Sequence, residues 1–222
     1  MASEVDICNL ALAHLGDAAQ VSSINPADSS AQAGHCSRFY PIARDTLLEM
    51  HPWGFATKRL SLSLTSNSVN QWAYVYAGPS DVVNYLTIID PAAADDFSGS
   101  LPLANQVPGA VNANQGIYQP QPFVVETDAT GADLVYTNQV NAVLKYSAKV
   151  TDTTTFSPLF VESLALMLAG MLAGPVIKGA EGRAVAKEMQ GLFQMFFGRA
   201  TMSDANQRRT AIAQSVSWMV NR

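Results

Sequence analysis

The stretch FVESLALMLAGMLAGPVIK, which runs from Phe160 to Lys178, decides the fold because it is apolar on every side. No charged residue occurs between Ser163 and Ile177. A membrane-spanning helix needs about 20 apolar residues, and the Gly-Pro pair before Val176 is expected to end this helix too early for that. The stretch therefore predicts a helix that is buried by protein, in a chain that makes no contact with a membrane.

The two halves of this helix differ in the size of their side chains. At 100° per residue, the large side chains fall on one half and the small ones on the other. A half of small residues lets another helix backbone approach closely, so these positions are candidate contacts between subunits. Either the chain's own bundle or a neighbouring subunit is expected to cover them. The subunit-interface candidates are Ala165, Ala169, Gly170, Ala173 and Gly174, and the large half carries Leu164, Met167, Leu168, Met171 and Leu172.

Composition indicates a globular protein that assembles with other chains. Of the 222 residues, 48% are hydrophobic, which is enough for a core, and only 14% are charged, against about 25% in ordinary soluble domains. The net charge of -5 disfavours a protein that wraps nucleic acid, because phosphates attract an excess of Lys and Arg. The two cysteines are too few for a disulfide framework, and the N-terminus shows no export signal, so a reducing compartment such as a cytoplasm is expected.

Helical periodicity occupies both ends of the chain. Ser3 followed by Asp6 predicts a capped first helix. Asp28 is expected to cap a second helix that runs to Met50, with a kink or interruption at Pro41. After the quoted helix, residues 180–200 carry apolar side chains on one face and polar ones on the other, which predicts a last amphipathic helix.

The middle of the chain alternates between apolar and polar residues instead. Leu60, Leu62 and Leu64 are expected on the buried side of one strand, and Gly131 at a hairpin turn between two others. The strand-like runs follow one another without helices of crossover length, so the sheet should be mostly antiparallel. A long loop at about residues 90–121, rich in Ala, Pro, Asn and Gly, separates two of the strands.

These patterns predict an α+β fold. Residues 1–54 and 150–222 are expected to form a helical bundle from both chain ends, and residues 55–149 an inserted, mostly antiparallel β module.

Known catalytic and metal-binding patterns are missing from the sequence. The three histidines and two cysteines do not have the spacing of a zinc site, and no nucleotide-binding loop or nucleophile motif occurs, so no cofactor is expected. A carboxylate pair formed by Asp95 or Asp96 with Glu126 or Asp128 is the one enzymatic candidate, as acid and base on a glycoside. Adjacent Asp residues in a turn-rich loop are more often turn formers, so we expect a protein without catalytic activity.

Charge differs in sign between the middle of the chain and its end. The predicted β module is mostly acidic, and Asp90, Asp95 and Asp96 are the charges of its long loop. The last residues carry Arg208 and Arg209. Such a distribution suits a subunit that meets different partners on different surfaces.

Four stretches, read in order, give the sequence a resemblance to a known family. They are CNLALAHLG, FYPIARDTLLEMHPWGFATKRLSL, WAYVYAGPSDV and LKYSAKVTDTTTFSPLFVESLALMLAGMLA. In that order and spacing they resemble the tail tubular protein A family of short-tailed bacteriophages, the head-to-tail adaptor or gatekeeper. The resemblance extends from about Ser3 to Ala200 and is weakest in the loop from Pro91 to Gln121 and after Thr201.

The resemblance implies a structural virion protein. Such a protein would form a ring of about twelve copies at the head-tail junction, between the portal and the tail nozzle, with tail fibres as a further partner. DNA would pass through the ring without sequence-specific binding, along a lumen for which Asp90, Asp95 and Asp96 are candidates, since acidic side chains repel phosphate. Arg208 and Arg209 are the candidates for docking to the portal. The alternatives are a tail-associated hydrolase of cell wall or polysaccharide, and a small cytoplasmic binding domain.

Overall fold

A computed structural model describes residues 2–18, 20–66, 71–91 and 121–207 of the chain. They form an α+β fold, as predicted, in two compact units. The helical unit contains the residues up to Thr57 together with Ser147–Gln207, and the β unit contains Lys58–Tyr146.

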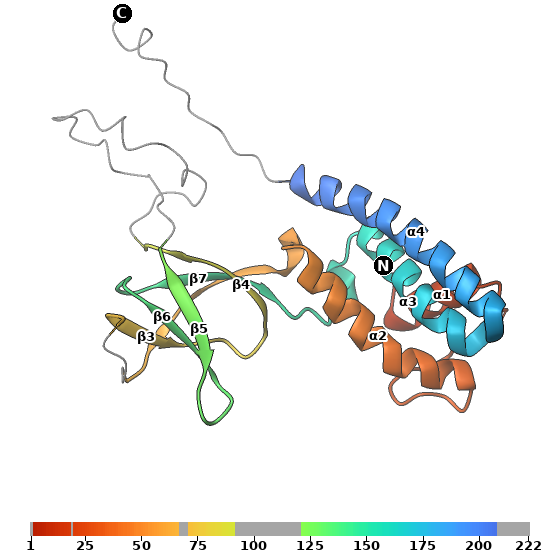
Figure 1. The fold of residues 1–222 in the computed structure, drawn as a ribbon, viewed down its shortest axis with the longest axis horizontal. Coiled ribbons are helices and arrows are strands. Elements are labelled where there is room, and N and C mark those ends of the chain that lie inside the picture. Colours follow the sequence, from red (N-terminus) through yellow and green to blue (C-terminus); the bar gives the residue numbers. More distant parts are fainter. Residues whose placement is uncertain (1, 19, 67–70, 92–120, 208–222) are drawn as a thin grey trace, which may run out of the picture. The chain divides into compact units, whose positions relative to one another are not determined.

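The helical unit is built around one central helix. Its elements are α1 (Glu4–His14), α2 (Ala31–Met50), α3 (Pro158–Ile177) and α4 (Gly179–Ala205), with short 3-10 turns η1 (Gly54–Ala56) and η3 (Thr153–Thr155). Helix α3, the stretch without charges, packs against each of the other three helices (Figure 1). Its apolar character is therefore explained by contacts within its own chain.

Side chains cap the start of three helices. Ser3 and Asp6 form the predicted capping box of α1, and Ser157 accepts a hydrogen bond from the amide of Phe160 at the start of α3. The prediction that Asp28 caps α2 is wrong, because Ser30 holds that position. The Asp28 carboxylate instead accepts a hydrogen bond from the Ser30 amide at 2.9 Å and supports the cap from outside the helix.

Two prolines lie inside helices that continue past them. Helix α2 passes through Pro41 without interruption, and α3 passes through Pro175 to Ile177. The predicted end of α3 at the Gly-Pro pair is therefore wrong, and of the two outcomes predicted at Pro41 the interruption does not occur. Pro41 is exposed, so the carbonyl that its missing N–H leaves free can bind water, while Tyr40 and Ala43 pack on the buried side. Packing of the buried face outweighs the lost hydrogen bond.

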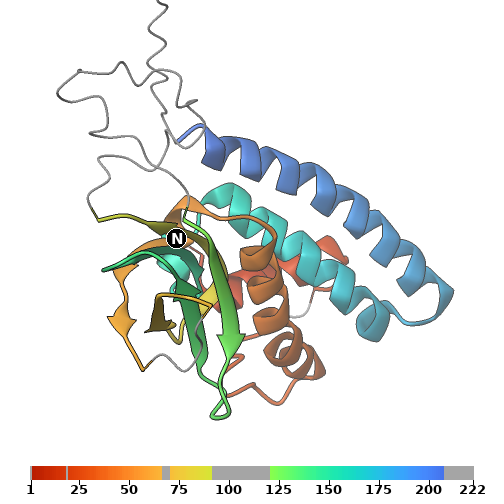
Figure 2. The ribbon, with the colours of Figure 1, turned by 60° about the vertical axis from the view of Figure 1, so that its left-hand side comes forward.

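Helices α3 and α4 form a hairpin with almost no loop. Lys178 and Gly179 both have positive φ, 63° and 64°, and reverse the chain between them. A glycine adopts this conformation without the steric cost that a side chain adds, which explains Gly179. The two helices consequently run side by side along their lengths (Figure 2).

Trp53 is the centre of an aromatic cluster in the helical unit. Its indole is 1% exposed and donates a hydrogen bond from Nε1 to the carbonyl of Leu47 at 2.8 Å. Phe160 of α3 and Phe197 of α4 meet its ring edge-on, with centroids 5.0 and 6.1 Å away. This one side chain therefore connects the end of α2 to both later helices.

The β unit contains two sheets. One has the strand order β1-β7-β4, from β1 (Thr57–Ser61), β7 (Val143–Ala148) and β4 (Val82–Ile89). The other has the order β2-β3-β6-β5, from β2 (Ser63–Leu64), β3 (Tyr74–Ala77), β6 (Asp133–Thr137) and β5 (Phe123–Thr127), and its neighbouring strands are antiparallel.

The leucine alternation at the start of the β unit does not define one buried face. Leu62 is buried, but Leu60 and Leu64 are 41% and 65% exposed, so that prediction is wrong for two of the three. The cause is a change of sheet at Leu62, since Leu60 belongs to β1 in one sheet and Leu64 to β2 in the other. The predicted hairpin turn is confirmed, because Gly131 has a φ of 85° between β5 and β6.

The ends of the long loop meet. Ile88 of β4 pairs with Gln121 in an antiparallel bridge, so the described residues on either side of the predicted loop lie side by side. Residues 92–120, which make up most of the predicted loop, lie outside the described residues.

Candidate interaction surfaces

The three alanines in the small half of α3 are covered by the chain itself. Ala165, Ala169 and Ala173 are completely buried, so the prediction that they form a contact between subunits is wrong for these three. Gly170 is partly exposed and Gly174 exposed, and both stay candidates by exposure alone. At the three alanines the chain's own bundle is therefore the cover, and at the two glycines the choice between the two alternatives stays open.

Helix α4 is the helix whose backbone comes close to the small half of α3. A Cβ atom placed on Gly182 would lie 2.8 Å from the backbone oxygen of Ala173, closer than real Cβ contacts come. One placed on Gly170 would lie 3.8 Å from the backbone oxygen of Ala186. The small side chains of α3 and the glycine of α4 therefore let the two backbones approach, as small residues do between closely packed helices.

A groove remains between α3 and α4. Its cavity has a volume of about 160 Å³. Leu166 and Phe193 are buried at its floor, and the partly exposed Met167, Gly170 and Met171 line it together with the exposed Gln190. The groove is apolar except for the Gln190 amide.

Helix α3 is long enough to cross a membrane, contrary to the length prediction. Within residues 2–18, 20–66, 71–91 and 121–207, it is the only helix whose length and composition would allow this. Half of that stretch is buried inside the helical unit, and core helices of soluble proteins have the same property. The absence of membrane contact stays a prediction, and it now rests on burial instead of length.

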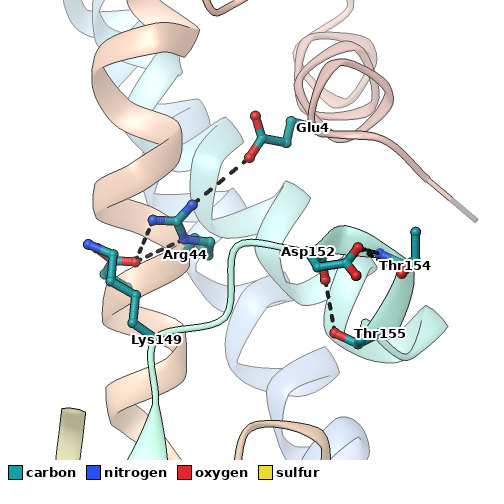
Figure 3. Close-up of polar contacts among 7 residues, drawn as sticks. Glu4, Arg44, Lys149, Asp152, Thr154 and Thr155 are labelled. Carbon is teal, nitrogen blue, oxygen red and sulfur yellow. Dashed lines mark hydrogen bonds and ion pairs between the residues drawn. The ribbon is translucent and has the colours of Figure 1, made fainter. Parts of the chain in front are cut away.

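An ionic cluster holds the returning chain against α1 and α2 (Figure 3). Arg44 of α2 is 5% exposed, and its guanidinium contacts Oδ1 of Asp45 at 2.8 Å and Oε1 of Glu4 at 3.9 Å. Lys149 reaches the other oxygen of Asp45 at 2.7 Å. Asp152 then caps η3 by accepting a hydrogen bond from the amide of Thr154 at 2.9 Å. Because Arg44 is buried, its pairing is a requirement of the fold and not a free binding site.

A second polar contact fixes the end of α4. Asp204 is 7% exposed, and its carboxylate accepts a hydrogen bond from the amide of Gly54 at 2.8 Å and lies 3.2 Å from Nε2 of His51. These partners are 150 or more residues away in sequence, so sequence periodicity gave no sign of the contact. It places the last described turn of the chain beside the end of α2.

Lys58, Asp81 and Tyr146 form a polar cluster in the β unit. Asp81 accepts hydrogen bonds from Lys58 at 2.7 Å and from the Tyr146 hydroxyl at 3.0 Å. The hydrogen bond from Lys58 is the main cause that lowers the pKa of Asp81 below its usual value. Burial, and then the hydrogen bond to Asp81, raise the pKa of Tyr146 to about 12.

We expect alkaline pH to destabilise the β unit through Tyr146. Its folded pKa of about 12 exceeds the unfolded value of 10.0, so its contribution to the free energy of unfolding is complete below pH 10 and is lost as pH rises toward 12. Urea midpoints measured by circular dichroism between pH 9 and 12 should fall, and Tyr146→Phe should make that fall less steep. An unchanged slope in the variant would contradict this assignment.

Large apolar side chains are exposed on both units. In the helical unit they lie on α2 and α4, and in the β unit on strands and the turn before β7. They are Ile42, Met50, Met195 and Met202 in the first unit and Leu60, Leu64, Val124 and Val140 in the second.

The remaining predicted site residues lie at or beyond the limits of the described chain. Asp90 follows β4 and is partly exposed. Asp95 and Asp96 of the lumen prediction and Arg208 and Arg209 of the docking prediction lie outside the described residues.

Of the two carboxylates of the enzymatic candidate that lie within the described residues, Glu126 is exposed on β5 and Asp128 is a turn former. Asp128 accepts hydrogen bonds from the Thr130 amide at 2.7 Å, the Thr130 hydroxyl at 2.6 Å and the Ala132 amide at 3.0 Å. The Thr130 hydroxyl is the main cause that lowers its pKa. In the part of the chain that the structure describes, no group of three or more His, Cys, Asp or Glu is arranged to hold a metal ion.

No protein-family model matches this chain, and a search of the curated proteins finds no significant match. Function therefore has to be inferred from the chain itself.

Proposed function

We propose that this chain is a structural subunit of the head-to-tail connector of a short-tailed bacteriophage. It would form a homo-oligomeric ring between the portal and the tail nozzle, through which DNA passes, and would carry out no catalysis. It would assemble in the host cytoplasm and reside at the head-tail junction of the virion.

The proposal is supported by what the residues of the resembling stretches do in the structure. Trp53, from HPWGF, organises the aromatic cluster, Arg44 pairs with Glu4 and so connects α2 to α1, and Ser157 starts the central helix. All three maintain a helical unit, made from both chain ends, that an inserted β unit interrupts. That arrangement is the one that the resemblance implies, and these motifs serve packing instead of a reactive site.

The surfaces of the helical unit suit a ring better than a symmetric pair. A ring needs two different patches on each subunit, because its contacts are heterologous. Exposed apolar side chains occur on two different helices, as Ile42 and Met50 on α2 and as Met195 and Met202 on α4. These residues replace the buried alanines of α3 as the candidates for the contact between subunits.

The proposal keeps the charged residues in the roles that the sequence indicated. Arg208 and Arg209 would dock to an acidic surface of the portal, and Asp90, Asp95 and Asp96 would face the DNA. The hydrolase alternative has less support, since the Asp128 carboxylate is engaged by three hydrogen bonds of its own turn.

Sedimentation with portal rings encoded in the same genome tests the subunit contact. We expect the protein to co-sediment with the rings, and Ile42→Asp to weaken this at least about tenfold, because a charge in an apolar contact costs more than about 1.4 kcal/mol. Ser37→Asp adds the same negative charge at another exposed position of the same helix and should have no effect. Equal binding of the two variants would exclude Ile42 from the contact.

A further inference from the structure

The groove between α3 and α4 has the size and chemistry of a site for one aromatic side chain. A dry cavity of about 150 Å³ is large enough to hold a benzene ring, and this one measures about 160 Å³. Met167 and Met171 on its walls are adaptable side chains that make favourable contacts with aromatic rings. Gln190 supplies the single polar group at the edge.

The residues that follow α4 contain one aromatic side chain. The sequence after Gln207 is RRTAIAQSVSWMVNR, in which Trp218 stands among Val216, Met219 and Val220. Removing apolar side chains of this kind from water lowers the free energy of the chain. An indole combines a large apolar ring with one N–H donor, and so matches an apolar groove that has one amide oxygen at its edge.

We propose that the indole of Trp218 binds in the α3–α4 groove of its own chain. The ring contacts Met167, Met171 and Phe193, and its N–H donates a hydrogen bond to the side-chain oxygen of Gln190. This inference does not depend on the connector role.

The chain is long enough to reach the groove. Gln190 and Phe193 precede Gln207 by 17 and 14 residues of helix, a distance of about 21–26 Å along α4. The 11 residues from Gln207 to Trp218 extend up to about 36 Å. The chain can therefore turn back after α4 and reach the groove.

The groove of the same chain is favoured over that of a second copy. A segment tethered by a short linker has an effective concentration in the millimolar range, far above the micromolar concentration of a purified protein. Insertion into the groove of a second copy would be favoured only if the segment could not reach the groove of its own chain. The 11 residues after Gln207 are long enough to reach it, given the rise of α4 per residue.

Disulfide trapping in the full chain tests this placement. Gln194 and Gln190 lie on the same side of α4, one turn apart, and both are exposed. In the variant with Gln194→Cys and Met219→Cys, mild oxidation should form a disulfide within one chain, detected by peptide mass spectrometry. The native Cys8 and Cys36 are completely buried and stay unreactive in the folded protein.

Two controls make the result specific. Glu188→Cys with Met219→Cys places the partner thiol on the opposite flank of α4 and should react at least about tenfold more slowly. Adding Trp218→Ala to the first variant should slow its disulfide formation about tenfold, since the ring no longer holds the segment in place.

The outcomes separate the alternatives. Mixing the two single-cysteine variants should give no cross-linked dimer at micromolar concentration. Equal rates for the Gln194 and Glu188 pairs, an unchanged rate with Trp218→Ala, or cross-links only between chains would each overturn the proposal.

Discussion

Replacing Trp53 with alanine should lower the free energy of unfolding of the helical unit by about 3–5 kcal/mol, the range for large aromatic side chains in cores. The indole is 1% exposed and contacts aromatic rings of η1, α3 and α4. Its loss would leave a cavity where three parts of the unit meet, and the Leu47 carbonyl would lose its partner.

Urea unfolding followed by circular dichroism at 222 nm measures this change. Trp53→Phe, the matched control, keeps an aromatic ring and gives up the hydrogen bond to Leu47, so its cost should be smaller, about 1–2 kcal/mol. A cost below about 1 kcal/mol for Trp53→Ala would show that the cluster does not organise the unit.

Replacing Gly182 with leucine should destabilise the helical unit by about 3 kcal/mol, in spite of the better helix propensity of leucine. The new Cβ would lie 2.8 Å from the backbone oxygen of Ala173, and backbone cannot move aside as a side-chain tip can. Helices α3 and α4 would have to separate along the small half of α3.

Gly191→Leu is the matched control for this change. Gly191 lies in the same helix, is exposed, and has no atom within 4 Å of an added Cβ. This variant should be more stable than the parent by about 0.5–1 kcal/mol because glycine is a poor helix former. Thermal unfolding of both variants checks the pair, and a change of the same sign in both would contradict the close approach of α3 and α4.

Local patterns predicted the class of fold and several local features correctly. The capping box at Ser3, the start of α3 at Ser157 and the turn at Gly131 each depend on residues within a few positions of one another, so the sequence alone reveals them. The size difference between the two halves of α3 also predicted a closely packed helix correctly.

Long-range packing explains the predictions that failed. The helix backbone that comes close to the small half at Ala173 is that of α4 of the same chain, and periodicity cannot distinguish that from a helix of another subunit. The burial of α2 overrides Pro41, and the sheet change at Leu62 exposes Leu60 and Leu64. The contacts of Asp204 and Arg44 join distant segments and leave no local signature.

Imaging the purified protein mixed with portal rings tests the proposed connector role most directly. We expect averaged electron micrographs to show an added ring on one face of the portal, with about twelve copies and an open central channel. Micrographs that show only portal rings without an added ring, at protein concentrations well above micromolar, would contradict the account.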